Sequence, residues 1–119
     1  MIITTVKQDE RAAFHGLLLL GDEDPAMLSR YEACGTLFGV WNSNHRPIAC
    51  ALVTVQDADT LELKNVAVAT AHQRQGIGTR LLQHVFWHDW DSQKRLLVGT
   101  GDADFANQRF YLQNGFRYC

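Results

Sequence analysis

The chain has 119 residues, of which 46% are hydrophobic and 20% charged, and its formal net charge is -2. This length and composition predict a single soluble globular domain over residues 1–119 with a real but modest core. The charge argues against a nucleic-acid binder that works through a basic face, and the longest apolar runs, such as Leu17–Leu20, are too short to span a bilayer.

The first half of the chain predicts a strand, two helices and a hairpin of two strands. An acidic loop at 21–25 ends in Pro25, which can begin the second helix, and Gly35 stops that helix. A polar turn at 42–47 separates the two strands of the hairpin. The predicted elements are a strand at Met1–Val6, helices at Asp9–Leu20 and Ala26–Cys34, and strands at Thr36–Trp41 and Ile48–Val55.

The next strand, Leu61–Val68, follows a second hairpin turn at 56–60 and loses its alternation part-way along. Leucines at 61 and 63 alternate with charged residues, but the apolar positions resume at 66 and not at Asn65. This slip in phase predicts a β-bulge, although a strand buried on both faces at its end would give the same pattern. A bulge releases backbone N–H and C=O groups from the sheet, and bulges are over-represented beside active sites.

A glycine-rich loop, Gln73–Gly78, follows this strand and opens into a helix, Thr79–Trp87. Apolar residues at 77, 81, 82, 85 and 86 share one face of the helix. The free N–H groups at its start, with the positive end of the helix dipole, predict a site for an anion, most often a phosphate, which Arg74 and Arg80 would flank. Alternatively, the two glycines only close a tight turn between strand and helix.

The spacing of the loop excludes two other phosphate-binding motifs. The dinucleotide fingerprint needs a third glycine, where this chain has Leu81, and the Walker loop needs a Gly-Lys-Ser/Thr sequence that does not occur.

The remainder of the chain predicts one more strand and one more helix. Arg95–Gly99 is a short apolar run typical of a buried strand. Asp102 or Asp104 can cap a helix that runs to about Gln113, and Asn114-Gly115 supplies its left-handed stop.

Two motifs together resemble the signatures of one family. Gln73–Gly78 matches the pattern Gln/Arg-x-x-Gly-x-Gly/Ala, and Phe110–Phe116 matches Phe/Leu-Tyr-x-x-x-Gly-Phe about one strand and one helix later. The chain therefore resembles, over its whole length, the GCN5-related N-acetyltransferase (GNAT) family. The resemblance implies an α/β fold with a mixed, mostly antiparallel central sheet and helices on both faces. It also implies acetyl-CoA as the cosubstrate, no metal, and transfer of the acetyl group to a primary amine of a small molecule or peptide.

The resemblance implies that the bulged strand pairs with the pantetheine arm of acetyl-CoA and that the loop binds its pyrophosphate. A later residue, Asn107, would contact the pantetheine arm; otherwise it is an exposed helical asparagine. The implied cofactor-binding residues are Val66, Ala67, Val68, Gln73, Arg74, Gln75, Gly76, Ile77, Gly78, Thr79 and Asn107.

Acetyl transfer also needs a stabilised oxyanion and two proton transfers. The oxyanion would accept a hydrogen bond from a freed backbone N–H near Val68. Tyr111 of the second motif is implied as the acid that protonates the leaving thiolate, and Glu62 resembles in position the base of the histone-acetylating branch. Without the resemblance, Tyr111 is a half-buried helical tyrosine and Glu62 a solvated strand residue, and many family members use a chain of waters as the base.

Partners and compartment are predicted less specifically. Asp22, Glu23 and Asp24 would attract a cationic amine, although a short acidic loop is often simply solvated. The chain ends at Cys119, before the last strands usual in the family, so either the sequence is truncated there or another chain completes the sheet. Exposed sheet edges predict a homodimer. Three widely spaced cysteines and an N-terminus without signal-peptide features predict reduced thiols in the cytoplasm.

Two other functions stay open at this point. One is a CoA-binding regulatory module that keeps the loop but lacks chemistry, and the other is a structural or dimerisation domain without a cofactor. His84 and His88 lie four residues apart, but no third ligand accompanies them, so we predict two surface histidines and no metal site.

Overall fold

The computed structural model describes residues 2–57, 60–89 and 95–98. Within these residues, five strands form one sheet in the order β1-β2-β3-β4-β5; the first three pairings are antiparallel and β4 runs parallel to β5. The predicted mixed, mostly antiparallel sheet is confirmed. The strands are β1 (Ile2–Thr5), β2 (Thr36–Trp41), β3 (Pro47–Asp57), β4 (Thr60–Val68) and β5 (Arg95–Val98).

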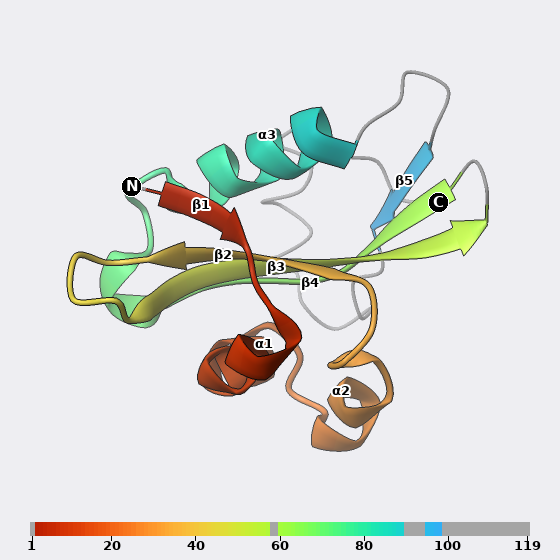
Figure 1. Cartoon of the computed structure of the whole chain (residues 1–119), viewed down its shortest axis with the longest axis horizontal. Helices are drawn as coiled ribbons and strands as arrows, with labels where there is room; N and C mark the ends of the chain where they lie inside the picture. Colours follow the sequence, from red (N-terminus) through yellow and green to blue (C-terminus); the bar gives the residue numbers. More distant parts are fainter. Residues whose placement is uncertain (1, 58–59, 90–94, 99–119) are drawn as a thin grey trace.

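Helices cover both faces of the sheet, as predicted (Figure 1). One face packs on α3 (Ile77–Asp89), and the other packs on α1 (His15–Gly21) and α2 (Pro25–Tyr31). Each face has its own apolar cluster. The cluster on the α3 side includes Phe38, Leu63, Val66, Leu81 and Leu82, and the cluster on the other side includes Phe14, Leu18, Leu28, Leu52 and Ala67.

The first predicted helix is wrong in type over its first half. Residues Gln8–Phe14 form a 3-10 helix, η1, and the α-helix α1 begins only at His15. Residues three apart line up in a 3-10 helix, so Arg11 and Phe14 both turn inward and are both buried.

The second helix is shorter than predicted, because α2 ends at Tyr31 and not at Cys34. Its start is as expected, with Pro25 in the first turn and Asp24 Oδ1 accepting the backbone N–H groups of residues 26 and 27. Beyond its end, the buried guanidinium of Arg11 donates to the carbonyl groups of Glu32, Cys34 and Gly35. This side chain pairs carbonyls that have no further helical turn to donate to them.

Two other elements are longer than predicted. β3 extends to Asp57, and α3 begins at Ile77 and extends to Asp89; a 3-10 turn that was not predicted, η2 (Thr70–His72), precedes the glycine-rich loop. The predicted strand at 95–99 is present over 95–98. The predicted helix ending near Gln113 and its Asn114-Gly115 stop lie outside the described residues.

Two predictions from composition can be compared with this part of the chain. Cys34 and Cys50 are both free thiols, the first exposed and the second buried, and burial raises the pKa of the Cys50 thiol to about 12. Among the helices that the structure describes, none has the length and apolar character needed to cross a membrane.

The packing of α3 predicts where substitutions reduce stability. Leu81 is fully buried in the cluster between α3 and the sheet. Leu81→Ala is expected to lower the free energy of unfolding by about 2–5 kcal/mol, because it removes buried methyl groups and leaves a cavity. Urea denaturation measures the loss. The control is Gln83→Ala on the exposed face of the same helix, expected to change stability by less than about 0.5 kcal/mol; equal losses would contradict the packing.

Candidate functional site

The bulge predicted in the fourth strand is present at Lys64 and Asn65. Leu52 of β3 lies opposite Asn65, while the next β3 residue, Val53, lies opposite Leu63, so Lys64 is one extra residue in β4. The insertion keeps Leu63 and Val66 in the same cluster, on the α3 face. Asn65 thereby turns to the other face, where it is buried.

Beyond the bulge, the backbone groups of β4 alternate between β3 and the open side. Ala69 donates its N–H to the carbonyl of Ile48 at 2.8 Å, and the register pairs Cys50 with Ala67. In an antiparallel pair, hydrogen-bonded and non-hydrogen-bonded positions alternate. The N–H and C=O groups of Val66 and Val68 therefore point away from β3.

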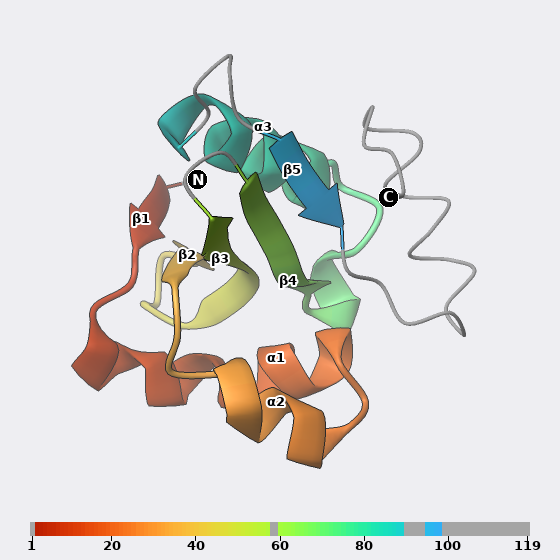
Figure 2. The same ribbon diagram turned by 90° about the vertical axis from the view of Figure 1, so that its right-hand side faces the viewer.

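The side to which these groups point lacks a neighbouring strand among the described residues. β5 pairs with residues 60–63 of β4 and ends at Val98, opposite Leu63 (Figure 2). The paired half of β4 lies before the bulge and the open half lies after it. Val66 and Val68 thus present a short row of backbone donors and acceptors to an extended ligand.

The glycine-rich loop leads into the start of α3. Arg74 and Gly76 both adopt positive φ angles, 65° and 78°. A Cβ added to Gly76 would have no described atom within 4 Å, apart from those of the residues next to it in the sequence. The first intrahelical bond runs from the N–H of Arg80 to the carbonyl of Gly76 at 3.1 Å. The N–H groups of residues 77–79 precede this bond, so they have no carbonyl of their own helix to donate to.

One side chain connects the loop to the open half of β4. Gln73 Nε2 donates to the carbonyl oxygen of Val68 at 3.1 Å. The start of α3, which favours an anion, and the open edge, which favours an extended chain, are therefore held near one another. Arg74 and Arg80 are exposed beside the loop, as expected for cations that meet further phosphate oxygens.

Glu62 lies in the half of β4 that precedes the bulge. Its side chain is 17% exposed, and its Oε1 is 3.1 Å from Lys64 Nζ. It lies four positions before Val66, a distance of about 13 Å between Cα atoms along an extended strand. Glu62 therefore lies on the paired half of β4, away from the outward backbone groups of Val66 and Val68.

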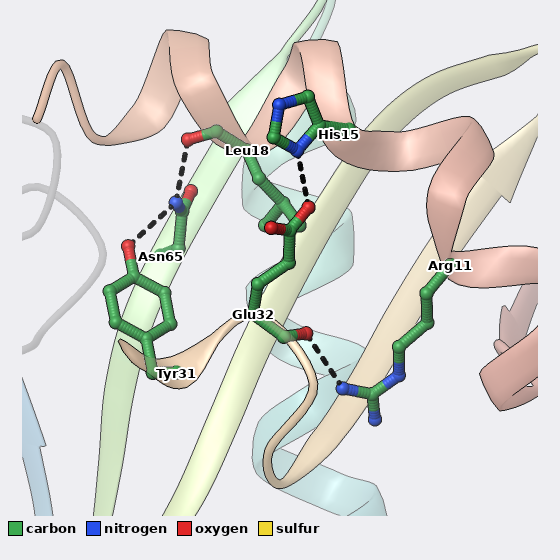
Figure 3. A network of polar contacts seen from close by, with 6 residues as sticks. All are labelled: Arg11, His15, Leu18, Tyr31, Glu32 and Asn65. Carbon is green, nitrogen blue, oxygen red and sulfur yellow. Dashed lines mark hydrogen bonds and ion pairs between the residues drawn. The ribbon is translucent and has the colours of Figure 1, made fainter. Parts of the chain in front are cut away.

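A buried polar network joins the bulge to the α1–α2 loop, and the sequence did not indicate it (Figure 3). Asn65 Nδ2 donates to the carbonyl of Leu18 at 2.8 Å and to the hydroxyl of Tyr31 at 3.1 Å. The Tyr31 hydroxyl donates to Asp22 Oδ2 at 2.7 Å. The signal available in the sequence was Asn65 itself, a polar residue in an apolar strand.

The acidic loop at 22–24 is more than a solvated turn. Asp22 Oδ1 accepts the N–H of Asp24, and Asp24 caps α2. Asp22 and Asp24 therefore hold local structure as well as carrying charge; Asp22 is half-buried, while Glu23 and Asp24 are exposed.

The remaining predicted site residues are placed only in part. Asn107 and Tyr111 lie outside the described residues. His84 is not a bare surface histidine, because its half-buried ring packs edge-on against Phe38 with ring centroids 5.8 Å apart. In the described ranges, the structure holds no group of three potential metal-ligating side chains.

Comparison with known proteins gives the same family for sequence and structure. The model of the acetyltransferase (GNAT) domain matches residues 34–118. A GNAT family acetyltransferase from Elizabethkingia anophelis, solved with acetyl-CoA bound, superposes with a TM-score of 0.83 and 31% identity over 98% of this chain and 75% of that protein.

Two further solved structures are similar. An IAA acetyltransferase from Bacillus cereus gives a TM-score of 0.81 and 28% identity over 98% of this chain and 76% of its own. The ribosomal-protein-S18-alanine N-acetyltransferase of Escherichia coli gives 0.74 and 22% identity over 98% and 77%. At this last level of identity the likeness concerns the fold alone.

The network around Tyr31 predicts a pH dependence of stability. Burial, followed by the hydrogen bond to Asp22, raises the pKa of Tyr31 above its ordinary value of 10.0. The unfolded chain therefore loses this proton first, and the stabilisation is complete below about pH 10 and declines above it by up to about 1.4 kcal/mol per pH unit. Unfolding in urea between pH 8 and 11 should show this decline in wild type and a shallower one in Tyr31→Phe; identical slopes would contradict it.

Proposed function

This chain belongs to the GNAT acetyltransferase family, and we propose that it transfers the acetyl group of acetyl-CoA to a primary amine of a small molecule or peptide. The observation that carries the proposal is the arrangement at the end of β4. Outward backbone groups at Val66 and Val68 adjoin a helix start with free N–H groups. An extended amide chain attached to a pyrophosphate, as in acetyl-CoA, fits this pair of surfaces.

In the proposed complex, the pyrophosphate accepts hydrogen bonds from the N–H groups at the start of α3. Residues of the loop Gln73–Thr79 surround it, with Arg74 and Arg80 as charged donors. The pantetheine amides pair with the outward groups of Val66 and Val68, as an added strand pairs with a sheet edge. Ala67 contributes its backbone to the same segment but faces β3.

The chemistry follows from this placement. The acceptor nitrogen attacks the thioester carbonyl carbon, the C–S bond breaks, and an outward N–H of Val66 or Val68 stabilises the oxyanion that forms between these steps. Tyr111 gives its proton to the leaving thiolate. The amine loses its proton to water, which passes it to Glu62 as the base.

A CoA-binding regulatory module without chemistry is the alternative from another functional class. It shares the loop and the open edge and differs in lacking turnover. A screen of CoA release with spermidine, kanamycin A and a peptide that begins with alanine separates the two functions, because a regulatory module binds acetyl-CoA and acetylates none of these amines.

The homodimer stays a prediction, and light scattering measures the oligomeric state.

Gly76→Asp is expected to weaken acetyl-CoA binding, because it puts a carboxylate beside the pyrophosphate. The matched control is Gly76→Asn, which has the same size and tolerates the same positive φ. We expect Gly76→Asp to raise the Kd for acetyl-CoA about tenfold more than Gly76→Asn does, equivalent to about 1.4 kcal/mol. Isothermal titration calorimetry measures both. Equal Kd values for the two variants would reject the phosphate-binding loop.

Tyr111→Phe is expected to slow the chemical step by about 10²–10⁴-fold while the Kd for acetyl-CoA stays nearly unchanged, because only the hydroxyl that acts as acid is removed. Single-turnover kinetics isolates this step from product release. A donor whose thiol is more acidic should reduce the loss, since its leaving group needs less help. If both proteins react at the same single-turnover rate, Tyr111 is not the acid.

A further inference from the structure

The buried position of Asn65 does not need a polar side chain for the stability of the fold. It is 2% exposed, and it lies in the bulge between two residues that pack on α3. Its Nδ2 makes two hydrogen bonds, but its Oδ1 is buried with no partner among the described residues. A buried acceptor without a partner costs stability, so an apolar residue would serve the core better.

The two bonds of Asn65 go to both helices that border the acidic loop. Leu18 is in the last turn of α1, and its carbonyl also accepts the N–H of Asp22 at 2.9 Å. Tyr31 is the last residue of α2 and donates to the carboxylate of Asp22. Both partners of Asn65 therefore also hold Asp22, the first residue of the loop; Figure 3 shows the two hydrogen bonds that Asn65 makes.

The same loop begins beside the proposed donor site. Gly21 ends α1 and lies so close to β4 that a Cβ added there would overlap Asn65 Oδ1 and lie 3.0 Å from the carbonyl oxygen of Val66. Val66 carries one of the two sets of backbone groups that point to the open edge. The start of the acidic loop is thus adjacent to the place where the thioester would lie.

We propose that Asn65 is a positioning residue for the acceptor: through Leu18 and Tyr31 it fixes the loop at 22–24 against the open edge of β4, where that loop forms one wall of the amine site. This inference rests on the proposed function. The acceptor it implies is a cationic primary amine, because Asp22, Glu23 and Asp24 make that wall acidic. The Tyr31 hydroxyl donates to Asp22 at 2.7 Å, which holds the start of this wall in place.

The proposed role predicts that substitutions in this network change the kinetics toward the acceptor amine but not the affinity for acetyl-CoA. Asn65→Asp has nearly the same shape but no N–H to donate to Leu18 or Tyr31. Tyr31→Phe keeps the ring and removes only the hydroxyl. Each variant is expected to lower kcat/KM for the acceptor about 10- to 100-fold, mainly through KM, because a misplaced wall misplaces the amine. The Kd for acetyl-CoA should change less than about twofold, since the loop at 73–79 is untouched.

The matched control is Thr4→Val, which also removes one hydroxyl at constant size. Thr4 Oγ1 accepts the indole N–H of Trp41 at 3.2 Å, on the far edge of the sheet from β4. Its loss should lower the melting temperature to a similar extent without changing KM. The double variant Asn65→Asp/Tyr31→Phe should be no worse than the poorer single variant, because both act through the same loop.

The probes are spermidine, kanamycin A and an alanine-starting peptide, with CoA release as the readout and acetyl-CoA titrations in parallel. A raised acceptor KM in Asn65→Asp and Tyr31→Phe, but not in Thr4→Val, supports the proposal. If wild type is active and both variants keep its KM, the positioning role is overturned while the proposed function stands. If Asn65→Asp does not fold, Tyr31→Phe decides alone. No turnover by wild type with any probe rejects the proposed function and this role together.

Discussion

The bulge at Lys64 and Asn65 is the constraint on which the rest of the site depends. If residues 63–66 alternated regularly, without the bulge, Asn65 would turn toward α3 and Val66 would leave the apolar cluster that holds that helix in place. With it, Leu63 and Val66 both pack under α3, and Asn65 reaches the opposite layer. One inserted residue therefore serves both layers, and it separates the half of β4 that pairs with β5 from the half that is open.

Side chains from neighbouring elements hold other parts of the proposed site next to the open half of β4. Gln73 ties the start of the loop to Val68, and the buried face of α3 fixes the direction of its N-terminus. On the opposite layer, Asn65 and Tyr31 hold Asp22, which follows Gly21, the residue that lies beside Val66. The donor and the acceptor would thus approach β4 from surfaces whose positions are both set within a few residues of the bulge.

Local patterns predicted most of the strands, the loop and the bulge, because each follows from side-chain periodicity or from glycine chemistry. The 3-10 helix before α1 was missed because Arg11 turns inward to bind carbonyls of residues 32, 34 and 35, which are distant in sequence. The Asn65–Tyr31–Asp22 network was missed for the same reason, since its partners lie 34 and 9 residues apart along the chain. Tertiary hydrogen bonds produce no periodic pattern in the sequence. A single Asn in an apolar strand indicates that it needs a hydrogen-bond partner but not which residue that partner is.

Amide hydrogen exchange of β4, measured with and without acetyl-CoA, tests the central claim most directly. The account places the N–H groups of Val66 and Val68 on the open edge and that of Ala67 against β3. Saturating acetyl-CoA should therefore slow exchange at Val66 and Val68 by roughly tenfold or more, as expected for amides that gain a hydrogen bond, and leave Ala67, which is already bonded, nearly unchanged. Bound acetyl-CoA that leaves exchange at both valines unaltered would contradict the proposed site.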